Sequence, residues 1–203
     1  SGTGAAGSNI ARMLKRLGVK TIYAYNINGV VDKANYDSYD FLIKELIDDE
    51  IYDTKVGHDG TLASLIKDAN VFIGVSAPNL VSVDMVKTMK DPFVFAMANP
   101  NPEITYEKAK EGGAVIVGTG RSDFPNQVNN LLAFPGIFRG ALDAKSKKIT
   151  EGMKMAATLA LANIIKDEEL SADYILPSAF DERVVKEVAE AVKNQAKKEG
   201  ICR

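Results

Sequence analysis

The chain has 203 residues, of which 46% are hydrophobic and 26% are charged, and its formal net charge is −2. A charge so close to zero gives no electrostatic case for nucleic acid or an anionic membrane as partner, and no apolar run approaches the roughly 18 residues of a membrane span. The sequence has a single histidine, His58, and a single cysteine, Cys202, which excludes a histidine-rich metal site and an internal disulfide. We expect a cytoplasmic protein.

A glycine pattern opens the chain. Gly2, Gly4 and Gly7 form a G-x-G-x-x-G sequence, and a helical pattern follows over residues 8–17. In a dinucleotide-binding fold these glycines permit a tight turn, the approach of the main chain to a pyrophosphate, and close packing of the helix on its strand. The N–H groups at the helix N-terminus then attract the phosphates. An ordinary small-residue turn is the alternative. The strand that should precede the loop is absent, so we expect a part of a longer protein.

The next run, residues 20–25, is β-branched and aromatic and predicts a strand. Its end lies about 20 residues beyond the glycine loop, where a dinucleotide-binding fold places the residue that faces the adenosine ribose. That residue is Asn26, which can hydrogen-bond a hydroxyl but carries no charge.

Strand and helix patterns then alternate. Short apolar runs predict strands at residues 71–75, 93–97 and 114–117. Apolar side chains at helical spacing predict helices at residues 39–47, 61–67, 82–89, 150–165 and about 182–199, with Thr150 and Asp181 as N-caps. Strands that are apolar throughout are typical of a parallel sheet with helices on both faces. We predict one α/β domain over residues 1–203, a Rossmann-like, doubly wound, mostly parallel sheet whose first strand is missing.

Ligands of open parallel sheets bind at the carboxyl ends of the strands, and two such ends are unusual here. Residues 74–78, Gly-Val-Ser-Ala-Pro, are small enough for a flat ligand to lie against the main chain. Residues 98–102 read Ala-Asn-Pro-Asn-Pro, and the amide of Asn99 can bridge a substrate carboxylate and a nicotinamide carboxamide. A stiff turn is the alternative interpretation of this run.

A third loop is rich in side-chain amides. Residues 118–130 read Gly-Thr-Gly-Arg-Ser-Asp-Phe-Pro-Asn-Gln-Val-Asn-Asn and lead into an apolar segment. This density of amides suits a loop that hydrogen-bonds a small polar ligand. A structural network of amides that caps the following helix is the alternative.

These loops resemble the NAD-binding domain of malic enzyme, in particular the compact prokaryotic type also called malate oxidoreductase. The resemblance rests on residues 74–78, 98–100 and above all 119–130 with Phe134-Pro135-Gly136, and it extends from Gly2 to about Val185, including residues 177–181. The family oxidises L-malate with NAD or NADP and decarboxylates the bound oxaloacetate to pyruvate with Mg or Mn. The resemblance implies the cofactor-binding part of such an oxidoreductase, usually a homodimer or larger homo-oligomer.

The resemblance also implies roles for individual residues. The cofactor would lie on the glycine loop, the residue after the second strand and the small-residue loop, namely Gly2, Gly4, Ala5, Ala6, Gly7, Asn26, Gly74, Val75, Ser76 and Ala77. Two asparagines, Asn99 and Asn130, match those that contact the substrate near the nicotinamide, and Asn99 also faces the cofactor. Asn26 stands where many members carry Asp, so the repulsion of the 2′-phosphate of NADP is removed, but its neighbours at residues 25–29 offer no cation to bind that phosphate. We therefore expect a modest preference for NAD with NADP tolerated.

The catalytic tyrosine, the catalytic lysine and the carboxylate metal ligands of the family belong to the segment before the glycine loop. We therefore assign no catalytic and no metal-binding residue in this sequence. Decarboxylation of a β-keto acid needs a Lewis acid and an acid–base pair, so we expect the chain alone to be inactive. The alternatives are another two-domain Rossmann oxidoreductase, such as an amino-acid dehydrogenase, which leaves residues 121–130 unexplained, and a non-catalytic dinucleotide-sensing module.

Overall fold

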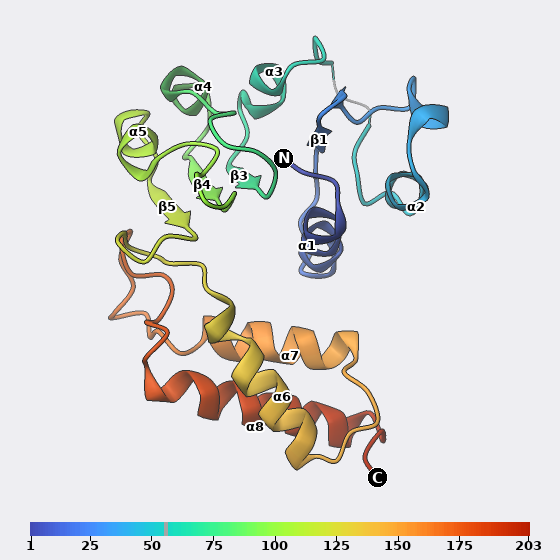
Figure 1. Cartoon of the computed structure of the whole chain (residues 1–203), viewed down its shortest axis with the longest axis vertical. Helices are drawn as coiled ribbons and strands as arrows, with labels where there is room; N and C mark the ends of the chain where they lie inside the picture. Colours follow the sequence, from blue (N-terminus) through green and yellow to red (C-terminus); the bar gives the residue numbers. More distant parts are fainter. Residues whose placement is uncertain (55–56) are drawn as a thin grey trace. The chain divides into compact units, whose positions relative to one another are not determined.

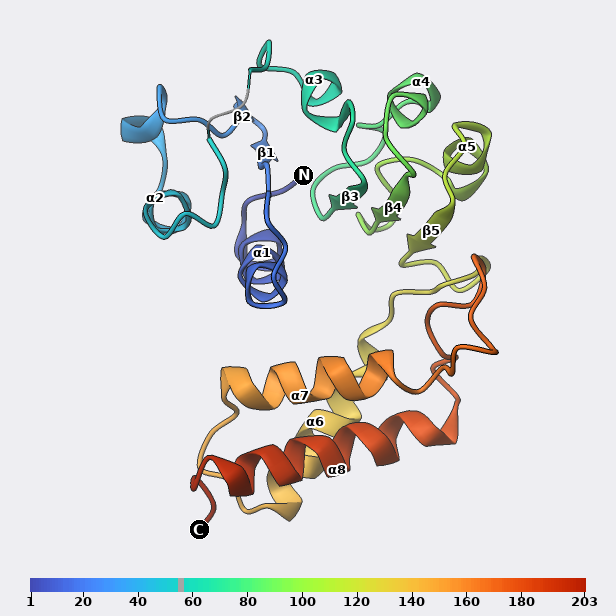
Figure 2. The same ribbon diagram turned by 180° about the vertical axis from the view of Figure 1, so that it is seen from behind.

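The structure is a computed structural model that describes residues 1–54 and 57–203 (Figures 1 and 2). The chain divides into two compact units, Ser1–Gly120 and Arg121–Arg203. The strands of the described residues all lie in the first unit, and the second unit is built around helices.

A parallel sheet of three strands organises the first unit. Its strands are β3 (Val71–Gly74), β4 (Phe93–Ala96) and β5 (Ile116–Thr119), in the order β3-β4-β5. The register aligns Phe72, Val94 and Val117 across the sheet. Side chains on the same strand alternate between the two faces, so these three residues share one face.

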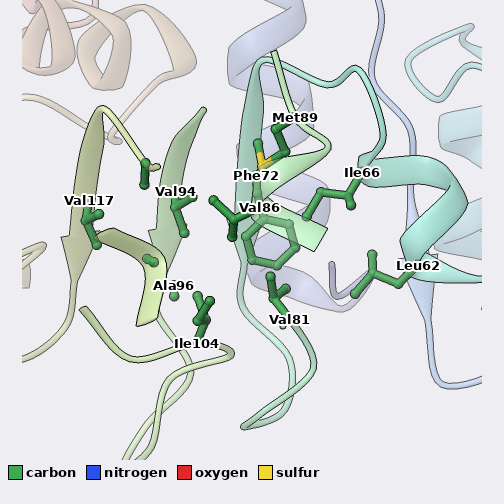
Figure 3. Close-up of a cluster of buried hydrophobic side chains, with 12 residues drawn as sticks. Leu62, Ile66, Phe72, Val81, Val86, Met89, Val94, Ala96, Ile104 and Val117 are labelled. Atoms are coloured by element: carbon green, nitrogen blue, oxygen red, sulfur yellow. The ribbon is translucent and has the colours of Figure 1, made fainter. Parts of the chain in front are cut away.

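Three short helices cover that face. They are α3 (Leu62–Ile66), α4 (Val83–Lys87) and α5 (Tyr106–Glu111), of which α4 joins β3 to β4 and α5 joins β4 to β5. Right-handed crossovers between parallel strands place both connecting helices on the same face. Figure 3 shows the resulting core, in which Val86 and Ile66 lie beside Phe72. The opposite face is less covered, since Val71 is 46% exposed.

The predicted α/β class and parallel strands are confirmed, with shifted bounds. The last strand begins at Ile116 instead of 114 because the Ala114 amide donates to the carbonyl of Ala109 at the end of α5 (3.0 Å). The helix α5 itself was not predicted. It has one buried residue, Ala109, and depends on Thr105, whose hydroxyl accepts from the Lys108 amide as an N-cap.

The N-terminal part of this unit has its own core. It comprises α1 (Ala5–Arg16), a hairpin of β1 (Tyr25–Asn26) and β2 (Gly29–Val30), the 3₁₀ turn η1 (Tyr36–Ser38) and α2 (Phe41–Asp48). The apolar sides of the two helices meet in a cluster that includes Ala11, Val31, Ile43 and Leu46.

The strand predicted at residues 20–25 is wrong in extent. Only its last residue, Tyr25, is in a strand, and that strand turns at Ile27-Asn28 into an antiparallel hairpin, one residue earlier than the Asn28-Gly29 pair. A cavity of about 440 Å³ separates residues 21–25 from β3 and is lined by apolar side chains that include Leu14, Ile22 and Phe72. Residues 21–24 consequently face a cavity where a sheet neighbour would supply a ladder of hydrogen bonds.

The second unit packs three helices together. After the 3₁₀ turn η2 (Asn130–Leu132) come α6 (Phe134–Asp143), which was not predicted, α7 (Glu151–Ala162) and α8 (Glu182–Lys198). Figures 1 and 2 both show α6 and α7 against α8. The two predicted N-caps are confirmed, since Thr150 accepts from the Met153 amide and Asp181 from the Arg183 amide. Among the described helices, none is long and apolar enough to cross a membrane.

Candidate functional site

The glycine loop is a tight turn that brings α1 against the end of β3. Gly2 has φ +98°, in the region that favours glycine, and its amide donates to the carbonyl of Tyr25 (2.8 Å). A Cβ on Gly7 would lie 1.9 Å from the carbonyl oxygen of Gly2. The amide of Val75 in turn donates to the carbonyl of Ser1 (3.0 Å). The first and third glycines therefore have the steric roles that the pattern predicts.

The N-terminus of α1 is open to a ligand. Gly4 is the N-cap, no side chain caps the helix, and its first turn has no acidic residue. The first amide to donate within the helix is that of Ser8, to Gly4 (3.0 Å). Gly4, Ala5 and Ala6 are exposed, and a Cβ on Gly4 would meet nothing within 4 Å. Main-chain N–H groups and the helix dipole at such an end attract an anion.

Asn26 is tied to the glycine loop. Its Nδ2 donates to Oγ1 of the buried Thr3 (3.3 Å), and its Oδ1 accepts from the amide of Asn28 (2.8 Å). The side chain is half-buried at the start of the β1–β2 turn. Its amide thus orients both the turn and the loop, a structural role that the sequence did not reveal.

The small-residue loop begins at a crowded position. Gly74 is buried, and a Cβ there would lie 2.3 Å from Cδ of Glu103. Val75 is half-buried, whereas Ser76 and Ala77 are exposed at the carboxyl end of β3. The glycine at position 74 therefore makes room for a carboxylate of this chain.

That carboxylate, Glu103, was missed by sequence reasoning. It is fully buried, and its Oε1 accepts from the amide of Ser76 (2.9 Å) while its Oε2 accepts from the amide of Ala98 (3.0 Å). The hydroxyl of Ser76 lies 3.5 Å from Oε1. In the sequence it is one carboxylate after the Asn-Pro-Asn-Pro run, with no pattern that separates it from a solvated residue.

Asn99 follows Ala98 directly and is exposed. Two residues before Asn99, the amide of Met97 donates a hydrogen bond to the carbonyl of Gly74 (2.9 Å), which places the ends of β3 and β4 side by side. The Asn99–Pro100 peptide bond is cis. The structure therefore brings Asn99 to the same sheet edge as residues 74–77, as the strand pattern predicts.

The amide-rich loop is partly structural. The buried Asn126 donates to the carbonyl of Ala172 (2.9 Å) and accepts from the amide of Ile175 (2.8 Å). Asn129 accepts from the amide of Leu131 (2.9 Å) and caps η2. Asn130 is exposed at the start of that turn. Asn126 and Asn129 therefore have structural roles, of which only that of Asn129 is a cap, and it caps η2 and not the helix α6. The side chain of Asn130 stays exposed.

Within residues 1–54 and 57–203, no group of three or more His, Cys, Asp or Glu side chains is arranged to hold a metal ion. The described residues do not fit a divalent-metal site, so no step is assigned to a metal on this chain.

The first unit thus contains a glycine loop, a helix α1 without an N-terminal side-chain cap, and loops that follow β3 and β4 at one sheet edge. Known proteins are similar to this chain in sequence and fold. The sequence profile of the family described as "Malic enzyme, NAD binding domain" matches residues 1–197. The chain belongs to this family. The malic enzyme profile spans both compact units.

Individual malic enzymes are similar over the whole chain. The "Bifunctional malic/malolactic enzyme" of Bacillus subtilis is 48% identical over 204 residues, which cover 100% of this chain and 49% of that protein. The "NAD-dependent malic enzyme" of Geobacillus stearothermophilus is 43% identical, covering 100% of this chain and 42% of that protein. The chain thus spans about half the length of these relatives.

Solved structures agree with the family assignment. The NAD-dependent malic enzyme of Thermotoga maritima superposes with a TM-score of 0.87 at 42% sequence identity, covering 95% of this chain and 50% of that one. The malic enzyme of Entamoeba histolytica gives a TM-score of 0.89 at 35% identity, covering 100% of this chain and 43% of that one. The fold is that of the malic enzyme NAD-binding domain.

Proposed function

We propose that the chain is the cofactor-binding part of an NAD(P)-dependent malic enzyme that converts L-malate to pyruvate and CO₂. The observation that carries this proposal is the glycine loop, whose first and third glycines pack the loop tightly while the second faces open space. The amino-acid dehydrogenase alternative is disfavoured by the family match over residues 1–197. The catalytic acid–base pair and the Mg or Mn site belong, in this proposal, to a segment of the intact enzyme outside this chain.

Each group of residues has one task in this proposal. The main-chain N–H groups of Ala5, Ala6 and Gly7 would hold the pyrophosphate, because they precede the first hydrogen bond of α1. Asn26 would face the ribose from the β1–β2 turn. The residues Gly74, Val75, Ser76 and Ala77 would line the cofactor. Asn99 and Asn130 would donate hydrogen bonds to the substrate. The dinucleotide supplies the hydride acceptor.

We further propose that the sheet is completed in the intact enzyme by a strand that enters directly before Ser1. The nitrogen of Ser1 donates to the carbonyl of Ile73 (2.7 Å), and the carbonyl of Ser1 accepts from the amide of Val75 (3.0 Å), so Ser1 already pairs with β3. The cavity of about 440 Å³ lies beside Ser1, between β3 and residues 21–25. A strand there would complete the doubly wound sheet. We also propose that residues 1–203 belong to the NAD(P)-binding domain of a cytoplasmic homo-oligomer.

The proposal predicts binding without turnover for the chain alone. Titration calorimetry should detect NADH binding, and a malate oxidation assay with Mn should show no sustained NADH production. The intact enzyme serves as the positive control in the same assay. Sustained malate-dependent NADH production by the chain alone would contradict the division of labour, and no NADH binding by the chain or by the intact enzyme would contradict the cofactor assignment.

Cofactor choice is expected to respond to Asn26. In Asn26→Asp the carboxylate can still accept from the Asn28 amide, and the Thr3 hydroxyl can donate to it, so the turn should persist. The new charge would repel the 2′-phosphate of NADP and lower kcat/KM for NADP relative to NAD by about tenfold. Steady-state kinetics of the intact enzyme with both cofactors measures this ratio.

Asn28→Asp is the matched control for that experiment. Asn28 is exposed on the same turn, so this variant introduces the same charge two residues away. An equal change of cofactor preference in both variants would mean that Asn26 has no special position. A wild-type enzyme with a strong preference for NADP would contradict the expected preference for NAD.

A further inference from the structure

A single buried carboxylate joins the two strand-end loops of the first unit. We name residues 74–78 the first loop and residues 97–102 the second loop. Glu103 accepts from Ser76 of the first loop (2.9 Å) and from Ala98 of the second loop (3.0 Å), one through each carboxylate oxygen. Because it is fully buried, water does not compete for these hydrogen bonds.

The surroundings fix this carboxylate in place. Because Gly74 has no side chain, Cδ of Glu103 can lie next to it; a Cβ on residue 74 would lie only 2.3 Å from that Cδ. The main chain reinforces the link, since Val81 donates to the carbonyl of Glu103 (3.0 Å) and Asn79 donates to that of Pro102 (3.1 Å). The two loops are thus held at one spacing by contacts within the chain.

We propose that Glu103 is a positioning residue, which sets the relative position of the first loop and of Asn99 for the cofactor and the substrate. The inference rests on the proposed function, because it assumes that these loops contact them. Glu103 itself touches neither, since it lies buried beneath both loops. Hydrogen bonds between an ionised group and main-chain amides are among the stronger ones, so the carboxylate should set loop geometry more firmly than an amide would.

The test is Glu103→Gln in the intact enzyme. Glutamine has nearly the same shape but a single acceptor oxygen, so its NH₂ group must face one of the two main-chain donors. At a temperature where the variant is folded, we expect kcat/KM for malate to fall about ten- to a hundredfold and the Kd for NADH to rise. Bound NADH should also show altered nicotinamide fluorescence.

Val86→Ala is the matched control, since Val86 is fully buried in the core of the same unit, and the hydrogen bonds of Glu103 to Ser76 and Ala98 do not involve its side chain. It should lower Tm and leave Kd, KM and the fluorescence of bound NADH unchanged. If Glu103→Gln behaves like Val86→Ala, the residue is merely structural and the inference is overturned. A wild-type enzyme that binds no dinucleotide would instead overturn the proposed function, and this inference with it.

A second measurement needs no variant. If Glu103 holds both loops in advance, the amides of Ser76 and Ala98 should be protected from hydrogen exchange in the wild-type enzyme without cofactor. Protection that appears only after NADH is added would overturn the inference. This measurement can overturn the inference even if Glu103→Gln fails to fold.

Discussion

Replacing Gly7 with alanine is expected to disrupt the cofactor site more than any other single methyl group. The new Cβ would lie 1.9 Å from the carbonyl oxygen of Gly2, so the loop and α1 must move apart. Overpacking of this kind costs about 3 kcal/mol. If the variant relieves this strain by displacing the loop, binding NADH must restore the strained loop, and the same energy then lowers the affinity for NADH roughly hundredfold. Titration calorimetry and thermal unfolding of the intact enzyme measure the two effects.

Gly4→Ala is the matched control on the same loop. Gly4 has φ −72° and a Cβ there would meet nothing within 4 Å, so the fold should tolerate alanine within about 0.5 kcal/mol. If the open space receives the pyrophosphate, this variant should lose at least about tenfold in NADH affinity while its Tm is unchanged. Wild-type affinity in Gly4→Ala would place the pyrophosphate elsewhere, and wild-type stability in Gly7→Ala would contradict the packing of the loop.

Alanine at Asn99 or at Asn130 is expected to damage catalysis with little loss of stability. Both side chains are exposed in the chain, so their amides are available to a ligand. A hydrogen bond to a charged substrate group contributes about 1.5–3 kcal/mol, so each variant of the intact enzyme should lose about ten- to a hundredfold in kcat/KM for malate. Steady-state kinetics with malate, together with Tm, separates the two effects.

Neighbouring asparagines supply the controls for these variants. Asn101 is exposed in the same Asn-Pro-Asn-Pro run as Asn99, and Asn101→Ala should have wild-type activity. Asn129 caps η2 next to Asn130, so Asn129→Ala should lose about 1 kcal/mol of stability, as capping residues do. If Asn99→Ala and Asn130→Ala lower Tm and keep full activity, their amides are structural.

The sequence predicted those strands and helices that are marked by residues within or directly beside them. Apolar runs located the three strands of the sheet, and polar caps located the start of α7 and α8, because these signals lie within a few residues of the element they define. Helix α6 was missed although its apolar residues keep helical spacing, because Pro135, Gly136 and Gly140 are typical of a loop. Proline is tolerated in the first turn of a helix, and the two glycines are buried where α6 packs on α8, a contact between distant segments that the sequence does not reveal.

The candidate site was predictable only where a motif is contiguous. The steric roles of Gly2 and Gly7 follow from their spacing and are borne out by the close contacts around them. Glu103 could not be found in this way, because its partners Ser76 and Ala98 are 27 and 5 residues away in the sequence. The structural use of Asn126 likewise depends on Ala172 and Ile175, which only the folded chain brings near it.

The contact between Gly74 and Glu103 also constrains how descendants of this sequence can vary. Any side chain at position 74 would collide with the carboxylate, and any shorter residue at position 103 would leave two main-chain amides without an acceptor. Each single change alone is therefore harmful, and a double change is tolerated only when the side chain that refills the space also accepts from these two amides. Natural selection should consequently retain Gly74 and Glu103 together or replace them together, so that the two positions covary.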